Sequence, residues 1–246
     1  MDFYDKVINH RSIRQFDGRE VDKEILDKII SGALQTATST GMQQSSIIVV
    51  TDKEKKKAIS QVCSQDYVAD APHLFIFIVD LYRNRRIFEE KEGEFNPESD
   101  VDNFFQGFSD AILMAQNTNN IVESFGLGGV FLGSILNDVE KMIEILELPE
   151  LTLPVLGLGF GYPNENPQLK PRIPKEYRVF ENSYKVEENY LEAIKDYDEE
   201  MKTYYDLRDK NRRSDSFTNQ VVSKNKNRLP KRAKILEIAR KNGFKL

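Results

Sequence analysis

The chain has 246 residues, enough for one large domain or two small ones. Hydrophobic residues make up 39% of it and charged residues 30%, as in ordinary globular proteins. The single cysteine excludes an intramolecular disulfide framework, and with only two histidines the sequence predicts no metal site. The longest apolar runs, residues 74–79 and 153–160, are too short to span a bilayer, and the acidic first residues carry no secretory pattern. We therefore expect a cytoplasmic protein with no membrane partner.

Charge is distributed unevenly along the chain. The net charge is −5, but residues 208–245 carry 13 Lys or Arg against 3 Asp or Glu, so the rest of the chain is strongly acidic. A basic tail of this kind has three interpretations: a nucleic-acid-binding segment, a solvated C-terminal helix, or a site for a phosphorylated cofactor. Composition does not decide between them.

The first half of the chain alternates helical and extended patterns. Residues 2–9 predict a short helix that leads into His10-Arg11-Ser12-Ile13-Arg14. Asp22 is the expected N-cap of an amphipathic helix, because apolar residues recur at helical spacing from Ile25 to Leu34. Small hydroxyl residues then favour a loop at 37–41. The sequence next predicts a strand at 47–51, a surface helix at 52–62 and a central strand, apolar on both faces, at 73–80.

The second half is dominated by one long helix. Its apolar residues keep helical spacing from Phe104 to Val122 and fill other faces too, so we expect burial nearly all round, with a C-cap at Phe125-Gly126. The highly charged residues 84–100 before it favour a mobile surface loop or lid. After it the sequence predicts strands at 129–132 and 153–159, a polar loop at 164–174, and helices at 138–146, 186–207 and 231–242. Helices and strands alternate imperfectly, so we predict an α+β fold, a central sheet wrapped by helices.

The glycine-rich stretches do not form a dinucleotide motif. Gly157-Leu158-Gly159-Phe160-Gly161 and Gly126-Leu127-Gly128-Gly129 both depart from G-x-G-x-x-G, and Tyr162-Pro163 follows the first where a helix would be needed. There is no P-loop and no G-x-S-x-G, and two histidines leave few ways to build a Ser-His-Asp triad. A bound cofactor is therefore the better candidate for the chemistry, and we nominate no catalytic side chain.

Two separated stretches carry donors suited to a phosphate. One consists of His10, Arg11, Ser12 and Arg14, and the other of Lys170 and Arg172. The planar guanidinium fork of arginine matches phosphate oxygens. In the second stretch, alternate residues of an extended segment point the same way, so both cations could face one anion. Either stretch alone could also be a solvated basic turn.

Three further stretches hold polar or small residues that could contact the same ligand. They are Ser39, Thr40 and Gln43; Gln65 with Tyr67; and Phe131, Leu132, Gly133 and Ser134. Hydroxyl and amide groups could hydrogen-bond a polar ring edge, and a glycine lets the backbone approach a flat ligand closely. The alternatives are an ordinary hydroxyl-rich loop, a helix end and the end of a core strand.

Taken in order, these stretches resemble the nitroreductase/flavin reductase family, specifically its NADPH-dependent FMN branch, over nearly the whole chain. The resemblance implies that residues 10–14 bind FMN, mainly its phosphate, with Arg14 reaching toward the ribityl chain or ring. It implies that Lys170 and Arg172 lie around the phosphate and the ring edge, where a cation stabilises the reduced flavin, and that the three further stretches bind the ribityl chain and ring. Gly41 departs from the family, which usually has a bulky aromatic residue there, so the shape of the substrate pocket does not follow from the resemblance.

The same resemblance gives the basic tail a role. Arg208 and Arg213 fall where NADPH-preferring members of the family carry arginines for the 2′-phosphate, with Phe217 where tryptophan is common. That phosphate adds about two negative charges, so an arginine pair contributes selectivity for NADPH.

The sequence thus leads to one main hypothesis, an FMN-dependent NADPH oxidoreductase. NADPH would deliver hydride to FMN, and a nitroaromatic, a quinone or free flavin would then take electrons at the same face, which gives ping-pong kinetics. Residues 1–246 would form a single nitroreductase-like domain with an antiparallel or mixed sheet. The resemblance further implies an intertwined homodimer with FMN at the interface, and we expect the basic extension, about residues 186–246, to wrap around the partner. The alternatives are a flavin-binding protein without turnover and a nucleic-acid-binding protein that uses the basic tail; the main hypothesis includes no nucleic acid.

Overall fold

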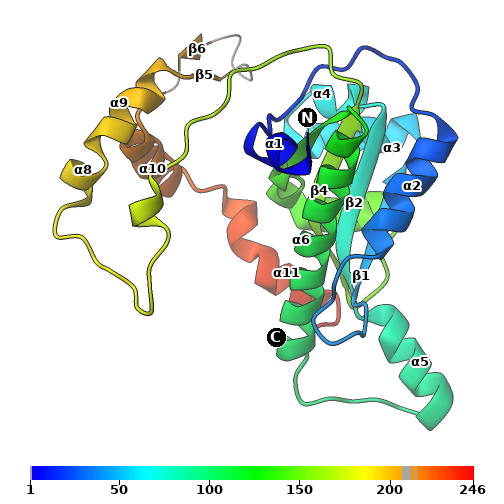
Figure 1. Ribbon diagram of the computed structural model, residues 1–246. Coiled ribbons are helices and arrows are strands. Elements are labelled where there is room, and N and C mark those ends of the chain that lie inside the picture. Colours follow the sequence, from blue (N-terminus) through cyan, green and yellow to red (C-terminus); the bar gives the residue numbers. More distant parts are fainter. Residues whose placement is uncertain (1, 207–211, 214) are drawn as a thin grey trace. The chain divides into compact units, whose positions relative to one another are not determined.

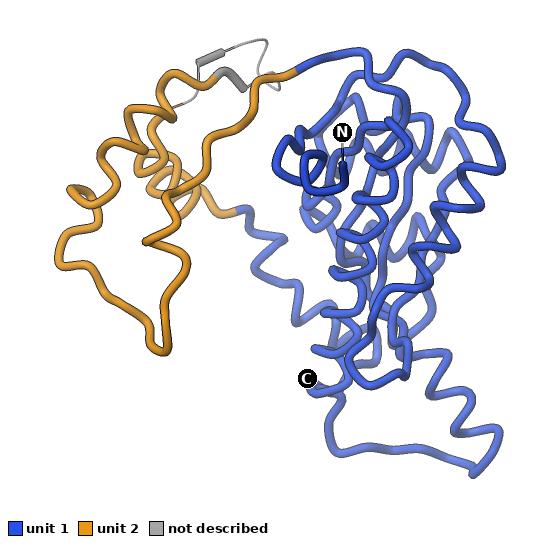
Figure 2. Tube along the Cα trace, viewed as in Figure 1, with its two compact units in different colours: residues 1–166, 229–246 blue, residues 167–228 orange. Residues whose placement is uncertain are grey.

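A computed structural model describes residues 2–206, 212–213 and 215–246, and for residues 205–206 and 212–213 the backbone alone. The chain divides into two compact units (Figure 2). Unit 1 consists of Met1–Asn166 and Leu229–Leu246, and unit 2 of Pro167–Arg228. No helix within the described residues combines the length and apolar character that a membrane crossing requires.

Unit 1 is built on a four-stranded antiparallel sheet (Figure 1). In spatial order its strands are β1 (Ser45–Val50), β2 (His73–Asp80), β4 (Thr152–Gly161) and β3 (Gly128–Leu132). Strands β1 and β3 are therefore the two edges of the sheet. Strand β2 spans the predicted residues, and its six inner residues are buried, as expected of a strand covered on both faces. The sheet and its covering helices confirm the predicted α+β class.

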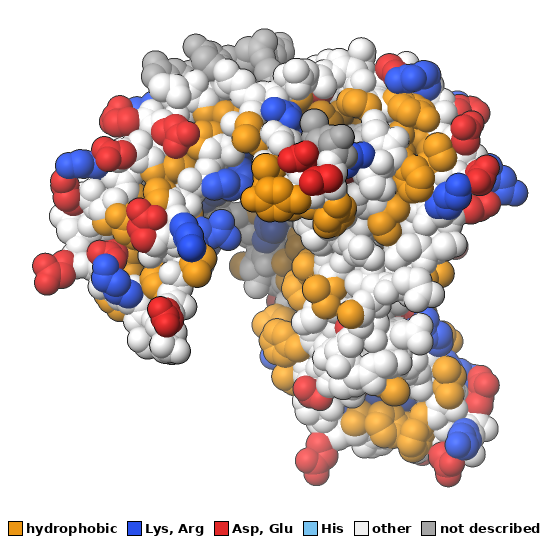
Figure 3. All heavy atoms as spheres, viewed as in Figure 1, with side chains coloured by type: hydrophobic (Ala, Val, Ile, Leu, Met, Phe, Trp, Pro, Cys, Tyr) orange, Lys and Arg blue, Asp and Glu red, His pale blue; other side chains and the backbone are white. Residues whose placement is uncertain are grey.

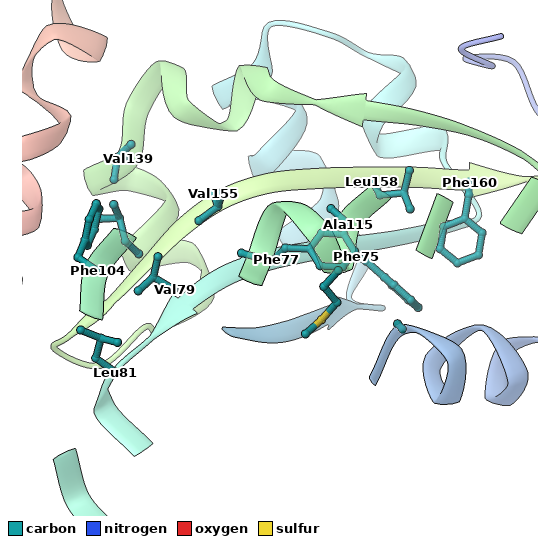
Figure 4. Close-up of a cluster of buried hydrophobic side chains, with 14 of the residues drawn as sticks. Phe75, Phe77, Val79, Leu81, Phe104, Ala115, Val139, Val155, Leu158 and Phe160 are labelled. Carbon is teal, nitrogen blue, oxygen red and sulfur yellow. The ribbon is translucent and has the colours of Figure 1, made fainter. Parts of the chain in front are cut away.

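One face of the sheet is covered by α6 (Val101–Ser124), the predicted long helix (Figure 1). Its buried residues, such as Ala111 and Ala115, join the cluster formed by Phe75, Phe77 and Phe160 of the sheet (Figure 4). The helix ends at Ser124 with Phe125 as its C-cap, as predicted, and Gly126 follows with φ +77°, a conformation that favours glycine.

The prediction that α6 is buried nearly all round is wrong for the single chain. Phe105 is 63% exposed and Leu113 50%, and Phe108 and Ile112 are more than a third exposed. Apolar spacing predicted the helix correctly, but it could not show that one apolar face has no cover from the described part of the same chain.

The opposite face of the sheet is covered by α3 (Lys53–Cys63) and α7 (Val139–Leu146). The β2 side chains that alternate with the first set, Leu74, Ile76 and Ile78, pack there against Ile59 and Met142. Because successive side chains of a strand point to opposite faces, β2 contributes to both apolar layers.

The remaining helices of unit 1 are short. They are α1 (Phe3–Ile8), α2 (Lys23–Leu34), α4 (Tyr67–Asp70), α5 (Tyr82–Glu92), η1 (Gly133–Asp138), η4 (Pro230–Lys234) and α11 (Ile235–Lys241). Asp2, Asp52 and Asp138 begin their helices by accepting backbone N–H groups of the first turn. Asp22 holds the predicted N-cap position of α2, but its side chain makes no capping hydrogen bond. The helix predicted at 231–242 begins as a 3₁₀ turn, η4, with Pro230 in its first position.

The charged stretch 84–100 is not the loop that we predicted. Its first part belongs to α5, and Gly93 ends that helix with φ +94°. High charge misled the prediction because the charges pair along the helix: Arg86 contacts Glu90 at 3.3 Å, one turn away.

The irregular remainder, 93–100, is fastened to the body of unit 1. Asp100 is 2% exposed and pairs with Arg85 at 3.0 Å. Its other carboxylate oxygen accepts the backbone N–H of Lys245 at 3.0 Å, close to the C-terminus.

Unit 2 has a small core of its own, formed by Ile194, Tyr197 and Met201. Its elements are η2 (Lys175–Tyr177), α8 (Tyr190–Ala193), α9 (Lys195–Thr203), β5 (Tyr205–Asp206), β6 (Arg212–Arg213) and α10 (Phe217–Lys226). The single helix predicted at 186–207 is instead two short ones. Asn189 caps the first, since its side chain accepts the backbone N–H groups of the next turn, and the helix therefore begins only at residue 190. Helix α10, which Ser216 caps, was not predicted from the sequence.

Candidate functional site

Residues 10–14 form an extended segment that lies against the edge strand β3. The backbone N–H of Ile13 donates to the carbonyl of Gly129 at 3.0 Å. The Ile13 side chain is buried and occupies the space that a side chain at Gly128 would need, because a Cβ there would lie 2.4 Å from its Cγ1. A glycine in the strand therefore makes room for the segment. We call residues 10–14 with Gly128–Ser134 the β3 edge.

His10 is oriented by an acid from α6. Its Nδ1 lies 2.5 Å from Oε1 of Glu123, which also accepts the side-chain amide of Asn119 at 3.0 Å. One turn before, Lys6 donates to the last carbonyls of α6, those of Glu123 at 3.0 Å and Ser124 at 2.7 Å. The start of the predicted phosphate-binding segment is thus fixed to the C-terminal end of the core helix.

The two arginines of the segment retain unused donors. Arg11 Nη1 donates to the carbonyl of Asn9 at 3.0 Å, and Arg14 Nη1 to that of Ser12 at 3.4 Å. The Nε atoms of both arginines are buried without a hydrogen-bond partner, and within the described residues neither guanidinium forms an ion pair. Buried cationic donors without an acceptor are costly, and an anion such as a phosphate would satisfy both. On this observation the residues fit the FMN phosphate.

An acid also shapes this end of the site. One carboxylate oxygen of Glu165 accepts the backbone N–H groups of Arg14 and, at 3.2 Å, of Gln15. Within the described residues Glu165 forms no ion pair with the Arg14 side chain, and its contact is with the backbone. Glu165 and Glu123 were not found by sequence reasoning, because their roles depend on contacts with a segment 151 and 113 residues away.

The other end of the β3 edge brings two predicted residues together. Gln65 lies just after α3. The hydroxyl of Ser134, in η1, donates to Oε1 of Gln65 at 2.8 Å. A Cβ at Gly133 would meet no atom within 4 Å, so the backbone is open there to a flat ligand. Leu132 is 1% exposed and belongs to the core, so any cofactor contact at that position would use its backbone.

The Gly133 turn is supported by the C-terminal segment. Arg232 Nη1 donates to the Gly133 carbonyl at 2.9 Å and to Oδ1 of Asn137 at 3.1 Å, and Lys231 pairs with Asp138. These two cations of the basic tail therefore have partners within unit 1, a role that none of the three interpretations of the tail included.

The residues Ser39, Thr40 and Gln43 lie in the 35–44 loop between α2 and β1. The Ser39 N–H donates to Oδ1 of Asp110 at 2.8 Å, and the Thr40 hydroxyl to Oε1 of Gln106 at 2.9 Å. Both partners belong to α6. The loop therefore has a defined conformation, held by the N-terminal half of the core helix.

The single chain does not bring this loop to the β3 edge. Strands β1 and β3 are opposite edges of the sheet, and three strand spacings of about 4.8 Å separate them. Along α6, the loop is held at Asp110 and His10 at Glu123; thirteen residues of helix correspond to about 20 Å. The structure thus gathers residues 10–14, Gln65 and Gly133–Ser134 along one edge and leaves Ser39, Thr40 and Gln43 at the other.

The remaining predicted residues belong to unit 2 or lie outside the description. Arg172 Nη1 donates to the carbonyl of Lys170 at 3.1 Å, so this guanidinium folds back over its own segment. Arg208 lies outside the described residues, and so does the side chain of Arg213. The assignment of these four residues to a cofactor site stays a prediction.

Two family models match the chain and together cover most of it. Residues 7–162 match the nitroreductase family, and residues 170–246 match the C-terminal domain of the nitroreductase family. The first match contains the whole β3 edge and the 35–44 loop, and the second contains Lys170 and Arg172.

Individual relatives match most of the length of this chain. The chain is 35% identical over 245 residues to an NADPH-dependent oxidoreductase of Staphylococcus saprophyticus, covering 98% of this chain and 97% of the relative. It is 34% identical to the FMN reductase (NADPH) of Bacillus subtilis, with 88% of each chain covered. The solved NADPH:FMN oxidoreductase from Vibrio harveyi, complexed with NAD+, has a TM-score of 0.85 and 31% identity, covering 98% of this chain and 97% of that chain. The chain belongs to the nitroreductase family, as its ordered motifs predicted.

Proposed function

We propose that this protein is an NADPH-dependent oxidoreductase that uses FMN. The enzyme class and the cofactor agree with the names of relatives that cover most of the chain, and both were expected from the sequence. The observation within the chain that carries the proposal is the pair of buried, unpartnered Nε atoms of Arg11 and Arg14. They supply cationic donors where the resemblance leads us to expect the phosphate of FMN.

FMN, when bound, accepts hydride from NADPH and passes electrons on, so the chain itself needs only to bind, orient and shield. Arg11 and Arg14 bind the phosphate, and the polar side chains of Ser134 and Gln65 lie near the ring. Lys170 and Arg172 of unit 2 add positive charge around the phosphate and ring edge. A cation at the ring edge favours the anionic reduced form of the cofactor.

The site is completed by a second copy of the chain. The β3 edge and the 35–44 loop lie at opposite edges of one sheet, so one FMN contacts both sets only if they come from two subunits. The exposed apolar side chains of α6, among them Phe105 and Leu113, give a surface that a partner would cover. Hydrophobic side chains exposed on unit 1 are visible in Figure 3. In this homodimer the extension at about 186–246 wraps around the partner.

The electron acceptors are small molecules: nitroaromatics, quinones or free flavin. Acceptor and NADPH use the same face of the cofactor in turn, which gives ping-pong kinetics. Arg208 and Arg213 select NADPH through its 2′-phosphate. The enzyme acts in the cytoplasm.

The visible spectrum of the purified protein tests the proposal. Flavin bands that bleach under anaerobic NADPH, and much less with NADH, support cofactor, reaction and selectivity together. Equal bleaching by both nucleotides removes the role of Arg208 and Arg213 and keeps the enzyme. Flavin bands that neither nucleotide bleaches point to a flavin-binding protein without turnover, and no bands after addition of FMN contradict the whole proposal.

A further inference from the structure

A buried carboxylate on α6 closes the 35–44 loop. Asp110 is 2% exposed, and its two oxygens accept backbone N–H groups from the middle and from the end of the loop, from Ser39 at 2.8 Å and from Gln44 at 3.2 Å. Within the described residues it has no ion-pair partner. A buried carboxylate is costly without compensation, and here the compensation comes from the amides of the loop.

Gly107, one turn before Asp110, lets the end of the loop approach α6 closely. A Cβ at Gly107 would lie 2.6 Å from the carbonyl oxygen of Gln44 and 3.0 Å from Cγ1 of Val79. Any side chain there would push the end of the loop off the helix. Gly107 and Asp110 thus act as one clamp, since the first allows the contact and the second fixes it.

The tip of the loop is held from a second helix. Asn84 of α5 donates to the carbonyl of Met42 at 2.9 Å, and Arg83 donates to that of Gln43. Gly41 and Gln43 have φ values of +75° and +51°. A left-handed glutamine is unfavourable by itself, so contacts outside the loop must impose this conformation.

We propose that Asp110 is the positioning residue of the flavin site, which acts through the backbone of the 35–44 loop. It holds Ser39, Thr40 and Gln43 in the one arrangement that presents their polar groups to the FMN of the partner subunit. Asp110 itself does not touch the cofactor. The proposal rests on the proposed function and extends it to a residue that no binding motif contains.

The test is FMN affinity in Asp110→Asn, measured by flavin fluorescence quenching on the apoprotein reloaded with FMN. This variant keeps the volume but turns one acceptor into a donor that faces a backbone N–H. The FMN dissociation constant should rise roughly tenfold, the loss of one hydrogen bond to a charged group. Asp27→Asn, on the exposed surface of α2, should change nothing. Ile238→Ala, a core truncation in α11 away from both the loop and the β3 edge, should lower the unfolding temperature but leave the dissociation constant unchanged.

Equal FMN affinity in Asp110→Asn and Ile238→Ala would overturn the positioning role. Amide hydrogen exchange of the wild-type apoprotein provides a second test that needs no variant. The Ser39 and Gln44 amides should be protected, and rapid exchange at both would equally overturn the role. A wild-type protein that binds no FMN contradicts the proposed function instead, so the two failures are distinguishable.

Discussion

The β3 edge and the 35–44 loop, the two halves of the proposed site, are held in opposite ways. At the β3 edge a short segment lies on a strand through one backbone hydrogen bond and a buried Ile13, while the Nε donors of Arg11 and Arg14 have no partner. In the loop, Asp110 and the α5 side chains already satisfy the backbone. The difference teaches that the β3 edge keeps cationic donors without a partner in the described chain, whereas the backbone of the loop has partners on α6 and α5.

The largest effect should come from removing the cations of the β3 edge. Arg11→Ala with Arg14→Ala should weaken FMN binding by about a thousandfold, because two charge-assisted hydrogen-bond partners of the phosphate are lost. Stability of the apoprotein should fall little, since the deleted Nε donors are unsatisfied and the Nη1 atoms donate only to carbonyls two residues away. Flavin content after purification and titration of the apoprotein measure the effect. Arg19→Ala, an exposed arginine that pairs with Asp17, is the control; a double variant that keeps its full flavin would place the phosphate elsewhere.

A smaller effect should follow from filling the space between the segment and the strand. Gly128→Ala puts a Cβ about 2.4 Å from Ile13, so the segment must shift. We expect a loss of about 2 kcal/mol in the free energy of unfolding, typical of overpacking. Urea unfolding of the apoprotein measures it.

Gly133→Ala at the far end of the same edge is the matched control, because a Cβ there meets nothing within 4 Å. In the double variant Gly128→Ala with Ile13→Ala, which removes the Cγ1 and Cγ2 atoms that the new Cβ would meet, the loss should be smaller than the sum of the two single losses. Equal stability of the Gly128 and Gly133 variants would mean that the segment is not packed on β3.

Mixing two defective chains tests whether the halves come from different subunits. One chain carries Arg11→Ala with Arg14→Ala, and the other Thr40→Ala with Gln43→Ala. If each site combines the β3 edge of one chain with the loop of the other, half of randomly mixed dimers contain one intact site, so roughly a quarter of all sites recover FMN. Flavin bound after unfolding and refolding the mixture measures this recovery. No recovery above the average of the separate variants would show that each chain builds its site alone.

The sequence was informative where local pattern decides the structure. Strand β2 was predicted at its observed bounds because a continuous apolar run needs cover on both faces, and α6 ended at Phe125-Gly126 because a glycine follows in the left-handed region. Helix α5 was missed because its charges satisfy each other along the helix, so high charge did not mean irregular structure. Asp110 was missed because its role depends on hydrogen bonds from backbone amides 66 and 71 residues away, and no local sequence pattern predicts such contacts.

Sheet order was equally hidden from the sequence. The motifs appear in the order expected of the family, yet the chain order of β1 and β3 does not reveal that they form opposite edges. The sequence could therefore nominate the residues of the site but not divide them into two groups. That division follows from the tertiary structure, and it is the reason why we propose that a second subunit completes the site.

The smallest effect should be a pH dependence of the free energy of unfolding, caused by a histidine in the sheet between the two regions. His73 begins β2, stacks on Phe160 of β4 with ring centroids 5.1 Å apart, and has a buried Nε2 without a partner. Burial, and secondarily the charge of Lys56, lowers the pKa of His73 below its usual value. The folded protein therefore binds this proton less readily than the unfolded chain. Above about pH 6.5 both forms are neutral and His73 has no effect, whereas below it only the unfolded chain gains the proton and stability falls as the pH falls.

The slope from this one group is at most about 1.4 kcal/mol per pH unit, and it levels off below the folded pKa. Urea unfolding of the apoprotein between pH 7.5 and 5, compared with His73→Phe, isolates the contribution because the variant keeps a ring on Phe160 and removes the titration. If the two proteins lose stability in parallel, His73 is not the group responsible. If only the wild type declines, protonation of His73 in the unfolded chain is what lowers the stability of the sheet between the β3 edge and the 35–44 loop in acid.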